Sequence, residues 1–518
     1  MDVNGKAFRA FREREEALRN QYDASRAAKQ HSKGKLAAWE RIDLLFDTGS
    51  FEEIDAYVTP AKGEVEFGKV EKSFGDGVIV GHGKINGRLI FAYAQDFTIM
   101  GGSLGIVHAK KIAKIQEMAL KMGAPVIGLM DSGGARIQEG IASLSGYATI
   151  FHNIISSSGI IPQISVIMGP AAGGAVYSPA LTDFVFMTSQ TSYMFVTGPN
   201  VVKEVLNEDV TSEELGGAEI HARKSGVANM IYDDEENTIL ALKKFLAYLP
   251  SNNLENPPEV PDDGSVADVN PKLRDIVPDD PNKAYDVRDV IVNLVDKNSF
   301  FETSELFAGS LVTGFARLKG KTIGIVANQP KVLAGVLDID SSTKGARFIR
   351  FCDAFNIPLL TLEDVPGFLP GVNQEHAGII RHGAKMLFAY AEATVPKITV
   401  ILRKAYGGAY IVMNSKNLGG DFNFAWPTAE IAVMGPDGAV AILYRRELAD
   451  SANPAEMKKE LVRKYREKVA NPFIADEQGY VDEVIDPAVT RQKIISAFEA
   501  LSNKWVKAPA RKHGNMPL

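Results

Sequence analysis

The apolar positions in the first part of the chain predict a β-hairpin followed by a helix. Two apolar runs, over residues 78–85 and 89–94, flank Asn86-Gly87, a dipeptide typical of the two-residue turn between antiparallel strands. Apolar residues then recur at helical spacing as far as Met122, and Gly123 suits the left-handed position that ends a helix. We therefore expect two paired strands and then an amphipathic helix.

Two further apolar runs predict buried strands, and each of them ends in glycines. Residues 125–130 lead into Ser132-Gly133-Gly134, and residues 163–168 lead into a turn that contains Gly173-Gly174-Ala175. Open α/β folds usually bind their ligands where the strands reach their carboxyl ends. Both glycine-rich turns are therefore candidate ligand-binding positions.

The same order of elements returns in the second half of the chain. The offset is about 233 residues, as from Gly87 to Gly320 or from Asp131 to Asp364. The Gly-Gly-Ala string also returns, as Gly407-Gly408-Ala409. Because solenoid repeats have periods of roughly 20–50 residues, a repeat this long indicates two domains of one fold.

A stretch rich in proline and aspartate separates the two halves. It includes Pro257, Pro258, Pro261, Pro271 and Pro278. It shows little periodic apolar character, which is typical of a linker. We expect an α/β protein with a first domain over residues 1–255, a linker over residues 256–285 and a second domain over residues 286–518.

The composition excludes several classes of protein. With 518 residues, 45% of them hydrophobic, each half is large enough to form its own core. The net charge of −7 comes without a basic stripe, which argues against binding of nucleic acid. No run of about 18 apolar residues occurs, so no membrane span is expected.

The N-terminal segment and the single cysteine favour a cytoplasmic location. Charged residues over positions 9–19 stand where a signal peptide would have apolar ones, and residues 7–26 predict an exposed, charged helix. Cys352 is the one cysteine, so we expect neither an internal disulfide nor a cysteine-based zinc site. It lies in a helical run and is expected in the core.

The glycine turns suggest a way to stabilise negative charge on oxygen. Glycine lets the backbone approach a ligand closely, so that neighbouring N–H groups converge on one oxygen. Removing one such donor typically lowers the rate by a factor of about 10²–10³. The alternative is that these glycines only make tight turns, but their recurrence at matched strand ends in both halves favours oxyanion holes.

Other catalytic motifs are weaker. The string from Gly101 to Gly105 matches the G-x-S-x-G nucleophile elbow around Ser103, but no histidine and acid are placed to activate this serine. The glycines at 75, 77 and 81 lack the spacing of a dinucleotide-binding fingerprint. The eight histidines form no metal-like cluster.

Four strings carry a resemblance to a known family. They are DSGGARIQEG (131–140), GGAVYS (173–178), DVPGFLPG (364–371) and RKAYGGAY (403–410). They closely resemble the carboxyltransferase chains of biotin-dependent enzymes, and the resemblance covers nearly the whole chain. It is nearest to the β subunits of propionyl-CoA carboxylases and the large subunits of methylmalonyl-CoA carboxyltransferases, and sodium-pumping methylmalonyl-CoA decarboxylases have a similar chain.

The resemblance implies two crotonase-like domains, each a spiral of ββα units, in a ring-shaped homohexamer. In this family the active site forms between the first domain of one subunit and the second domain of another. By similarity, the N–H groups of Gly174 and Ala175 would hold the acyl-CoA carbonyl, and those of Gly408 and Ala409 the ureido carbonyl of biotin. Two holes would then serve two oxygens, and the biotin nitrogen would take the α-proton without a side-chain base.

Further residues are implied to bind substrate. They are Ser132, Gly133, Gly134, Arg136, Gly173, Tyr177, Gly367, Phe368, Gly407, Tyr410 and Ile411. For Arg136, an ion pair within the domain is an equal alternative to a contact with a phosphate of CoA. Ile411 departs from the aspartate of many propionyl-CoA carboxylase β chains, which leaves the preferred acyl chain open.

The resemblance also implies partners. This chain has neither the Ala-Met-Lys-Met string on which biotin is carried nor a region resembling an ATP-grasp domain. Biotin would therefore arrive on a biotin carboxyl carrier protein. Three contexts remain open: a biotin carboxylase, a second carboxyltransferase, or the membrane subunits of a decarboxylase.

Two other classes of function are compatible with parts of the pattern. A hydratase or isomerase of the crotonase type would use one oxyanion hole and a carboxylate base, for which Glu139 is a candidate. A scaffold or CoA-binding module without catalysis would tolerate changes at both Gly-Gly-Ala turns.

Overall fold

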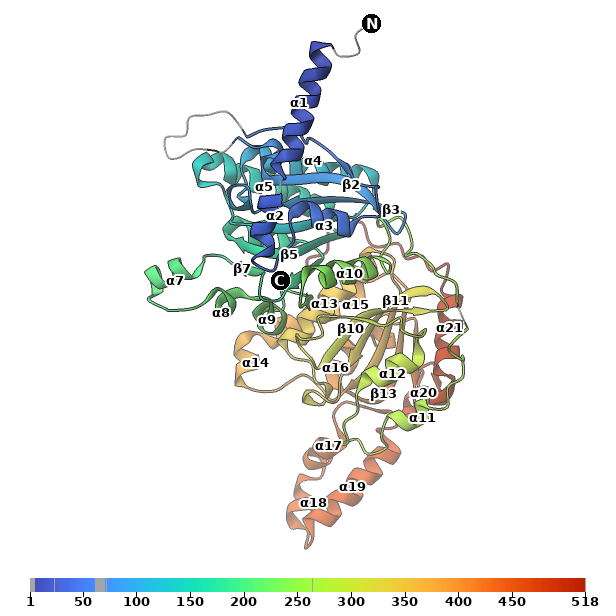
Figure 1. Cartoon of the computed structure of the whole chain (residues 1–518). Helices are drawn as coiled ribbons and strands as arrows, with labels where there is room; N and C mark the ends of the chain where they lie inside the picture. Colours follow the sequence, from blue (N-terminus) through green and yellow to red (C-terminus); the bar gives the residue numbers. More distant parts are fainter. Residues whose placement is uncertain (1–4, 23, 61–69, 71, 263, 518) are drawn as a thin grey trace. The chain divides into compact units, whose positions relative to one another are not determined.

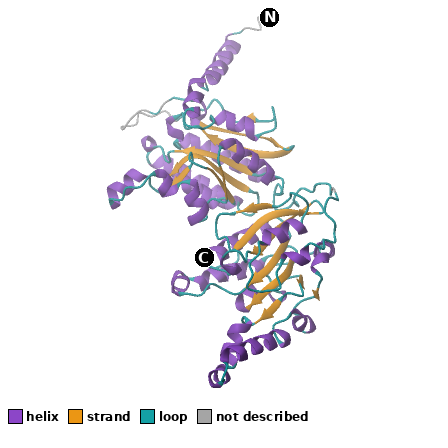
Figure 2. Cartoon of the chain, turned by 60° about the horizontal axis from the view of Figure 1, so that its bottom comes forward, coloured by secondary structure: helices purple, strands orange, loops and turns teal. Residues whose placement is uncertain are grey.

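The computed structural model describes residues 5–22, 24–60, 70, 72–262 and 264–517. The chain divides into two compact units, Met1–Glu255 (unit 1) and Asn256–Leu518 (unit 2), and each is built on one eight-stranded sheet. Within each unit helices lie against the sheet (Figures 1 and 2). Both units are therefore α/β structures.

The two sheets have the same strand order. In unit 1 the order is β1-β2-β3-β4-β5-β6-β8, with β7 paired to β5, and in unit 2 it is β9-β10-β11-β12-β13-β14-β16, with β15 paired to β13. In each sheet the first two pairings are antiparallel and the next ones parallel. The expected duplication of one α/β fold is confirmed.

The strands of unit 1 are β1 Glu52–Glu53, β2 Val78–Ile85, β3 Arg88–Gln95, β4 Val126–Ser132, β5 Gln163–Ala172, β6 Phe184–Thr188, β7 Tyr193–Phe195 and β8 Met230–Tyr232. Those of unit 2 are β9 Phe301–Thr303, β10 Leu311–Leu318, β11 Lys321–Asn328, β12 Leu359–Val365, β13 Lys397–Tyr406, β14 Phe422–Ala425, β15 Glu430–Ala432 and β16 Glu483–Val484.

The helices of unit 1 are α1 Lys6–Gln21, α2 Ala24–His31, α3 Ala38–Leu45, α4 Ile106–Met122, α5 Ile141–Ser157, α6 Tyr177–Leu181, α7 Pro199–Leu206, α8 Ser212–Gly216, α9 Ala218–Ile220 and α10 Glu235–Leu246. Those of unit 2 are α11 Leu273–Ile276, α12 Val287–Leu294, α13 Ile339–Ala354, α14 Val372–Ala377, α15 Ile379–Glu392, α16 Gly407–Val412, α17 Pro436–Leu443, α18 Arg445–Asp450, α19 Pro454–Lys468, α20 Pro472–Glu477 and α21 Thr490–Ala500.

Both predicted hairpins are present. Asn86 and Gly87 have φ of 51° and 78°, and Lys319 and Gly320 have φ of 51° and 77°. Two successive left-handed residues make the turn whose twist matches that of the flanking strands. The helix predicted after the first hairpin is α4, and Gly123 ends it in the left-handed conformation with φ of 61°.

Strands β4 and β12, which pair with β5 and β13, each have a register shift near their carboxyl end. It lies between Met130 and Ser132 in β4 and between Glu363 and Val365 in β12. Such bulges redirect the side chains of a strand and are common beside active sites. Both strands are buried along their whole length.

The segment between the two halves belongs to unit 2. Within residues 256–285, which the sequence predicts as a linker, α11 forms, and Leu273, Val277 and Tyr285 are buried in the core of that unit. Cys352 is buried in α13, as expected. The core of unit 2 therefore includes residues that lie before its first strand.

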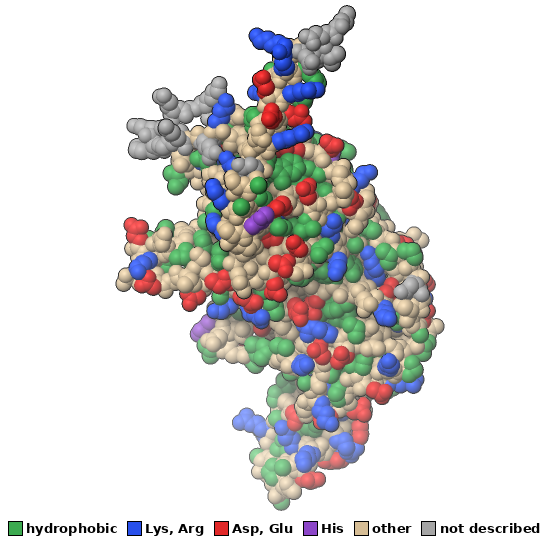
Figure 3. Space-filling view, viewed as in Figure 1, with side chains coloured by type: hydrophobic (Ala, Val, Ile, Leu, Met, Phe, Trp, Pro, Cys, Tyr) green, Lys and Arg blue, Asp and Glu red, His purple; other side chains and the backbone are tan. Residues whose placement is uncertain are grey.

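The surface has no basic stripe on the face seen in Figure 3, where acidic and basic side chains are interspersed. The predicted N-terminal charged helix is α1, which has no buried residue, and α2 follows it after Tyr22. Among the described residues no helix is long and apolar enough to cross a membrane.

Candidate functional site

The two Gly-Gly-Ala strings occupy the same place in the two units. Each directly follows the central strand, β5 or β13, and opens a short helical segment: the 3-10 turn Gly173–Val176 in unit 1 and α16 in unit 2. Gly173 and Gly407 both have φ of 60°, a conformation that favours glycine. The strands therefore end in the same backbone turn.

These turns present backbone N–H groups. The first N–H groups of a helix have no partner within it, and neither segment has a side-chain cap. The Gly173 N–H is used by the Val196 carbonyl at 3.1 Å. The N–H groups that follow are those of Gly174 and Ala175 in unit 1 and of Gly408 and Ala409 in unit 2, the residues expected from the sequence to form oxyanion holes.

The surroundings of the two turns differ. A Cβ on Gly174 would lie 2.9 Å from the ring of Tyr147, whereas a Cβ on Gly408 would have nothing within 4 Å. Gly174 is half-buried and Gly408 is exposed, while Ala175 and Ala409 are buried. The first turn thus lies against an aromatic wall, and the second is open.

The N–H groups of the two glycines after β4 already have hydrogen-bond partners within the protein. The Gly133 N–H donates to the Gly101 carbonyl at 2.9 Å, and the Gly134 N–H donates to Ser132 Oγ at 3.1 Å. The Gly134 carbonyl accepts from the Leu104 N–H at 2.9 Å. Both N–H groups are therefore used within unit 1.

Unit 2 has equivalent backbone contacts after β12, although the side chains there differ. The Gly367 carbonyl accepts from the Leu337 N–H at 3.1 Å, and Leu337 forms a bridge with Phe368, as Leu104 does with Ala135. The Phe368 ring contacts α15, because a Cβ on Gly383 would lie 2.8 Å from it. The backbone frame is the same in both units.

Three of the expected substrate-binding side chains flank the Gly-Gly-Ala turns. Tyr177 begins α6 and is exposed, and its ring lies 6.2 Å from that of Phe151. Tyr410 and Ile411 lie in α16, with Tyr410 half-buried and Ile411 exposed. Aromatic and apolar surface therefore lies beside both Gly-Gly-Ala turns.

A buried aspartate lies at the bulge of β4 and of β12. In unit 1, Asp131 Oδ2 accepts from Lys35 Nζ at 2.5 Å and from Arg41 Nη1 at 3.1 Å. Arg41 also contacts Glu235 at 2.7 Å, so that one guanidinium joins two buried carboxylates. The sequence motifs gave no sign of Lys35 or Arg41, which come from the segment around α3.

In unit 2 the aspartate is Asp364, and its partners differ. Its Oδ2 accepts from Arg403 Nε at 3.0 Å and from the Tyr285 hydroxyl at 2.9 Å, and its Oδ1 accepts from the Lys404 N–H at 3.0 Å. Burial raises the pKa of Asp364, and the Arg403 guanidinium opposes this rise. The aspartate therefore ties the end of β12 to β13, the strand that leads into the second turn.

Arg136 forms an ion pair within unit 1, which is one of the two roles that the sequence left open for this residue. Its guanidinium is buried, and Nη1 donates to Asp76 Oδ1 at 2.7 Å and to Glu139 Oε1 at 2.8 Å. Nη2 donates to the Ser103 carbonyl at 2.9 Å. All the contacts of this guanidinium are internal, so nothing in the geometry supports a contact with a phosphate of CoA.

Two competing assignments, a general base at Glu139 and a nucleophile at Ser103, are weakened by the contacts of Glu139 and His108. Glu139 Oε2 also accepts from the Ile106 N–H at 2.7 Å, so a general base at Glu139 would have to leave two donors. Burial lowers the pKa of His108 to about 3, and its ring contacts Gln95 and the Asp76 carbonyl rather than Ser103. Among the described residues no group of histidine, cysteine, aspartate and glutamate could hold a metal ion.

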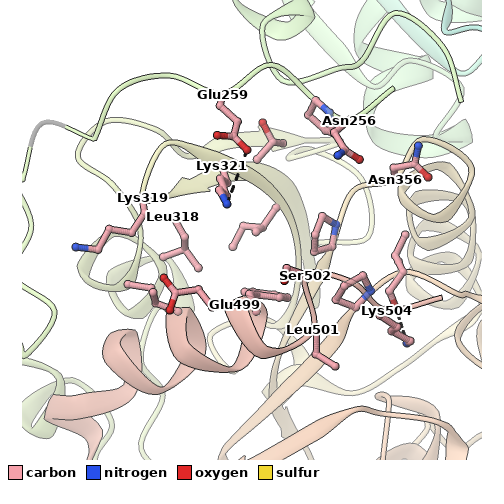
Figure 4. Close-up of a pocket in the computed structure, with 18 of the residues that line it drawn as sticks. Asn256, Glu259, Leu318, Lys319, Lys321, Asn356, Glu499, Leu501, Ser502 and Lys504 are labelled. Atoms are coloured by element: carbon pink, nitrogen blue, oxygen red, sulfur yellow. Dashed lines mark hydrogen bonds and ion pairs between the residues drawn. The ribbon is translucent and has the colours of Figure 1, made fainter. Parts of the chain in front are cut away.

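A pocket of about 650 Å³ lies elsewhere in unit 2 (Figure 4). Lys321, Pro358 and Pro396 line it, and these residues begin or directly precede β11, β12 and β13. The Gly-Gly-Ala turn follows the opposite, carboxyl end of β13. This pocket is therefore separate from the glycine turn of the same unit.

The chain is similar to carboxyltransferases over almost its whole length. Residues 29–516 match the carboxyl transferase domain family. The propionyl-CoA carboxylase beta chain of Cereibacter sphaeroides is 57% identical over 494 residues, 95% of this chain and 96% of that protein. The methylmalonyl-CoA decarboxylase subunit alpha of Propionigenium modestum is 52% identical over 522 residues, with both chains fully covered.

A solved structure has the same fold. The hexameric transcarboxylase 12S, with methylmalonyl-CoA and methylmalonic acid bound, matches with a TM-score of 0.95 and 49% identity, over 100% of this chain and 99% of that chain. At this similarity the two mixed sheets of equal strand order correspond to the duplicated domains of that enzyme.

Proposed function

Because the chain belongs to the carboxyl transferase family and is an acyl-CoA carboxyltransferase, we propose that it moves a carboxyl group between biotin on a partner and the α-carbon of propionyl-CoA. The observation that carries this proposal is the pair of equivalent Gly-Gly-Ala turns after β5 and β13. Each offers successive backbone donors at a strand end, where α/β folds bind ligands.

Two oxygens take up negative charge in this reaction. One is the thioester oxygen of the acyl-CoA when its α-carbon loses a proton, and we assign it to the N–H groups of Gly174 and Ala175. The other is the ureido oxygen of biotin, assigned to the N–H groups of Gly408 and Ala409. The open surroundings of Gly408 fit a group presented by another protein, and the Tyr147 wall fits a bound substrate.

Carboxybiotin, when bound, supplies both the carboxyl group and the basic nitrogen that accepts the α-proton. The chain itself then needs only to orient the two reactants and stabilise the two oxygens. Each backbone donor of this kind is worth about 2.7–4 kcal/mol. Ser103 Oγ accepts from Arg136 Nε at 3.4 Å and Glu139 Oε2 accepts from the Ile106 N–H at 2.7 Å, and this mechanism requires neither side chain as nucleophile or base.

The direction of transfer depends on the partner. The relatives named above include a propionyl-CoA carboxylase chain and a methylmalonyl-CoA decarboxylase chain at 57% and 52% identity, so the same half-reaction runs in both directions on similar chains. We propose carboxylation of propionyl-CoA in the cytoplasm with a biotin carboxyl carrier and a biotin carboxylase as the main function. Decarboxylation or transcarboxylation of methylmalonyl-CoA is the second candidate.

A homohexamer is part of the proposal. In unit 1, α7 protrudes (Figure 1). Its Val205 and Leu206 side chains are 72% and 63% exposed. Clustered apolar side chains on a surface helix mark interaction sites. A Val205→Asp variant should sediment as a smaller species than the wild-type chain; unchanged sedimentation would remove α7 from the subunit interface.

The main test is replacement of Gly408 by proline, which removes one donor of the second turn. Proline is tolerated in the first turn of a helix, because the N–H there has no helical partner. Carboxyl exchange between methylmalonyl-CoA and biotin should fall by a factor of about 10²–10³, while acyl-CoA binding, assigned to unit 1, should persist.

The matched control is Gly408→Ala, which keeps the N–H and adds a Cβ with no atom within 4 Å. It should fold like the wild-type chain. Circular dichroism and thermal melting establish that both variants are folded. Full exchange activity in a folded Gly408→Pro chain would contradict the assignment of the second turn.

A further inference from the structure

Tyr406, the last residue of β13, belongs to a side-chain network that the proposed mechanism does not use. Its hydroxyl donates to Glu430 of β15, and Glu430 also accepts from Arg466 Nε of α19 at 3.0 Å. Tyr406 is 6% exposed, and the Glu430 side chain is 12% exposed. A hydrogen bond with a charged partner is stronger than one between neutral groups. These three residues, the tyrosine network, therefore fix the phenol ring at the end of the strand.

The network lies directly before the second turn. β13 ends at Tyr406, and α16 begins with Gly407. The segment that connects β15 to α17 contacts both residues. A Cβ on Gly407 would lie 3.0 Å from the Val433 carbonyl, and a Cβ on Gly435 would lie 3.2 Å from the Tyr406 ring. A displacement of this ring therefore shifts the backbone at the start of α16.

Glu430 also joins the turn to the helical arm of unit 2, which consists of α17, α18 and α19. These helices pack on one another and extend away from the sheet (Figure 1). Arg466 lies in the last turn of α19. Asn471 Nδ2 donates to the Arg466 carbonyl at 3.3 Å and to the Glu467 carbonyl at 2.9 Å. The network therefore connects the second turn to a helix end that is itself held in place.

Unit 1 forms the same backbone turn with an alanine in place of the tyrosine. Ala172 ends β5 as Tyr406 ends β13, and each is the last residue paired with the short neighbouring strand, β7 or β15. Gly173 and Gly407 both have φ of 60°. The backbone conformation of the turn therefore does not require a tyrosine, so the network adds something else.

The surroundings of the two turns show what it adds. In unit 1 Gly174 lies against Tyr147, whereas a Cβ on Gly408 in unit 2 would have nothing within 4 Å. Stabilisation of a developing negative charge depends on donors that are fixed in place before the reaction. An open turn has no contacts on its ligand side, so it must be held from the side of the strand.

We propose that Tyr406 is a positioning residue of the second turn. Its hydrogen bond to Glu430, which Arg466 holds in place, fixes the start of α16. The N–H groups of Gly408 and Ala409 then stay directed at one oxygen. This inference rests on the proposed function of the second turn.

The first test is Tyr406→Phe in the full-length chain, which removes the hydroxyl and keeps the ring. The kcat of carboxyl exchange between methylmalonyl-CoA and biotin should fall by about ten- to a hundredfold, the usual effect of losing a hydrogen bond to a charged group. The KM for methylmalonyl-CoA, whose binding is assigned to unit 1, should not change.

Tyr390→Phe is the matched control. It removes another buried hydroxyl of unit 2, which lies 2.8 Å from that of Thr361. Compared at equal amounts of folded protein, this variant should keep the kcat of the wild-type chain. An equal loss of kcat in Tyr390→Phe and Tyr406→Phe would reduce Tyr406 to a contributor to stability and refute the proposal.

Two variants of Glu430 test whether Tyr406 acts through it. Glu430→Gln keeps an oxygen that accepts from the Tyr406 hydroxyl, so it should lose less activity than Glu430→Leu, which keeps none. Because both residues make one interaction, the double variant Tyr406→Phe/Glu430→Leu should be no slower than Glu430→Leu alone. Additive losses would show that the two residues act independently, against the proposal.

Amide hydrogen exchange gives a readout that needs no substrate. Peptides covering residues 405–412 should exchange faster in Tyr406→Phe than in the wild-type chain or in Tyr390→Phe. Equal exchange in all three chains would overturn the inference. A wild-type chain with the expected exchange pattern but no carboxyl exchange would contradict the proposed function alone and leave the positioning role of Tyr406 intact.

Discussion

Gly169 and Arg403 occupy the same position of the two central strands, each four residues before the Gly-Gly-Ala turn. In unit 2, Arg403 reaches the buried Asp364 from within β13. In unit 1, a Cβ at Gly169 would overlap Asp131 Oδ1, and the cation comes from Arg41 instead. Both units have the buried aspartate, but the arginine that pairs with it comes from a different element in each unit.

We predict that Gly169→Ala destabilises unit 1 strongly. The added Cβ must displace the Asp131 carboxylate from its cations, and disrupting a buried ion pair costs about 3–5 kcal/mol. Denaturant unfolding of the full chain measures the change. Gly438→Ala is the control, since its Cβ would make only an ordinary contact of 3.8 Å with Met434; equal stability of the two variants would contradict the role of Gly169.

Replacing Arg136 by alanine should affect stability rather than CoA binding. The change leaves Asp76 buried without its cation, so the free energy of unfolding should fall by about 3–5 kcal/mol. Lys114→Ala breaks an exposed ion pair with Asp55 and should lower it by about 0–1 kcal/mol. A large rise in the KM for acyl-CoA without loss of stability would instead place Arg136 at a phosphate.

The stability of unit 2 should depend on the titration of Lys344. Its Nζ donates to the Ser304 and Phe307 carbonyls at 2.9 and 2.8 Å, and burial lowers its pKa to about 7 from 10.5, partly opposed by Glu302. Between these values the unfolded chain binds more protons than the folded one. Stability should therefore rise with pH from 7 to 10.5, by up to about 1.4 kcal/mol per unit.

The measurement for Lys344 is the difference in unfolding free energy between the wild-type chain and Lys344→Met at several pH values. The two carbonyls lose their donor in the variant at every pH, which shifts the curve without changing its slope. A difference that stays constant from pH 7 to 10.5 would show that Lys344 does not titrate in this range.

Ile411→Asp should shift the preference among acyl chains toward shorter ones. Ile411 is an exposed apolar side chain directly after Tyr410, and a carboxylate there disfavours contact with a longer apolar chain. One methylene in such a site changes kcat/KM by roughly 10–200-fold. The ratios of kcat/KM for acetyl-, propionyl- and butyryl-CoA test this, with Ile411→Leu as control; unchanged ratios would place the acyl end elsewhere.

Elements with a local cause were predictable from the sequence. The hairpins at Asn86-Gly87 and Lys319-Gly320 depend on two residues that adopt positive φ, and the end of α4 depends on Gly123. The positions of the Gly-Gly-Ala turns followed from strand patterns and their repetition. Such features need no knowledge of distant residues.

The environment of the site was not predictable in this way. From the sequence, an internal ion pair and a contact with a phosphate were equal alternatives for Arg136. The structure shows that it pairs with Asp76, which lies 60 residues earlier in the chain. Arg41 lies 90 residues from Asp131, and no motif relates them. Contacts at such separations depend on how the helices close over the sheet.

By itself, the sequence determined that this protein has two α/β domains of one fold with glycine turns at matched strand ends, because periodicity and turn chemistry depend on neighbouring residues and the second half repeats both. The resemblance of four strings to a known family, and not these patterns, identified it as a carboxyltransferase. Only the tertiary structure decided which cation meets each buried aspartate, that Arg136 is internal, and that Glu430 joins Tyr406 to Arg466. Whether a side chain is buried, and which side chain it pairs with, depends on segments that are distant in the sequence and pack together. A local sequence pattern therefore does not predict it.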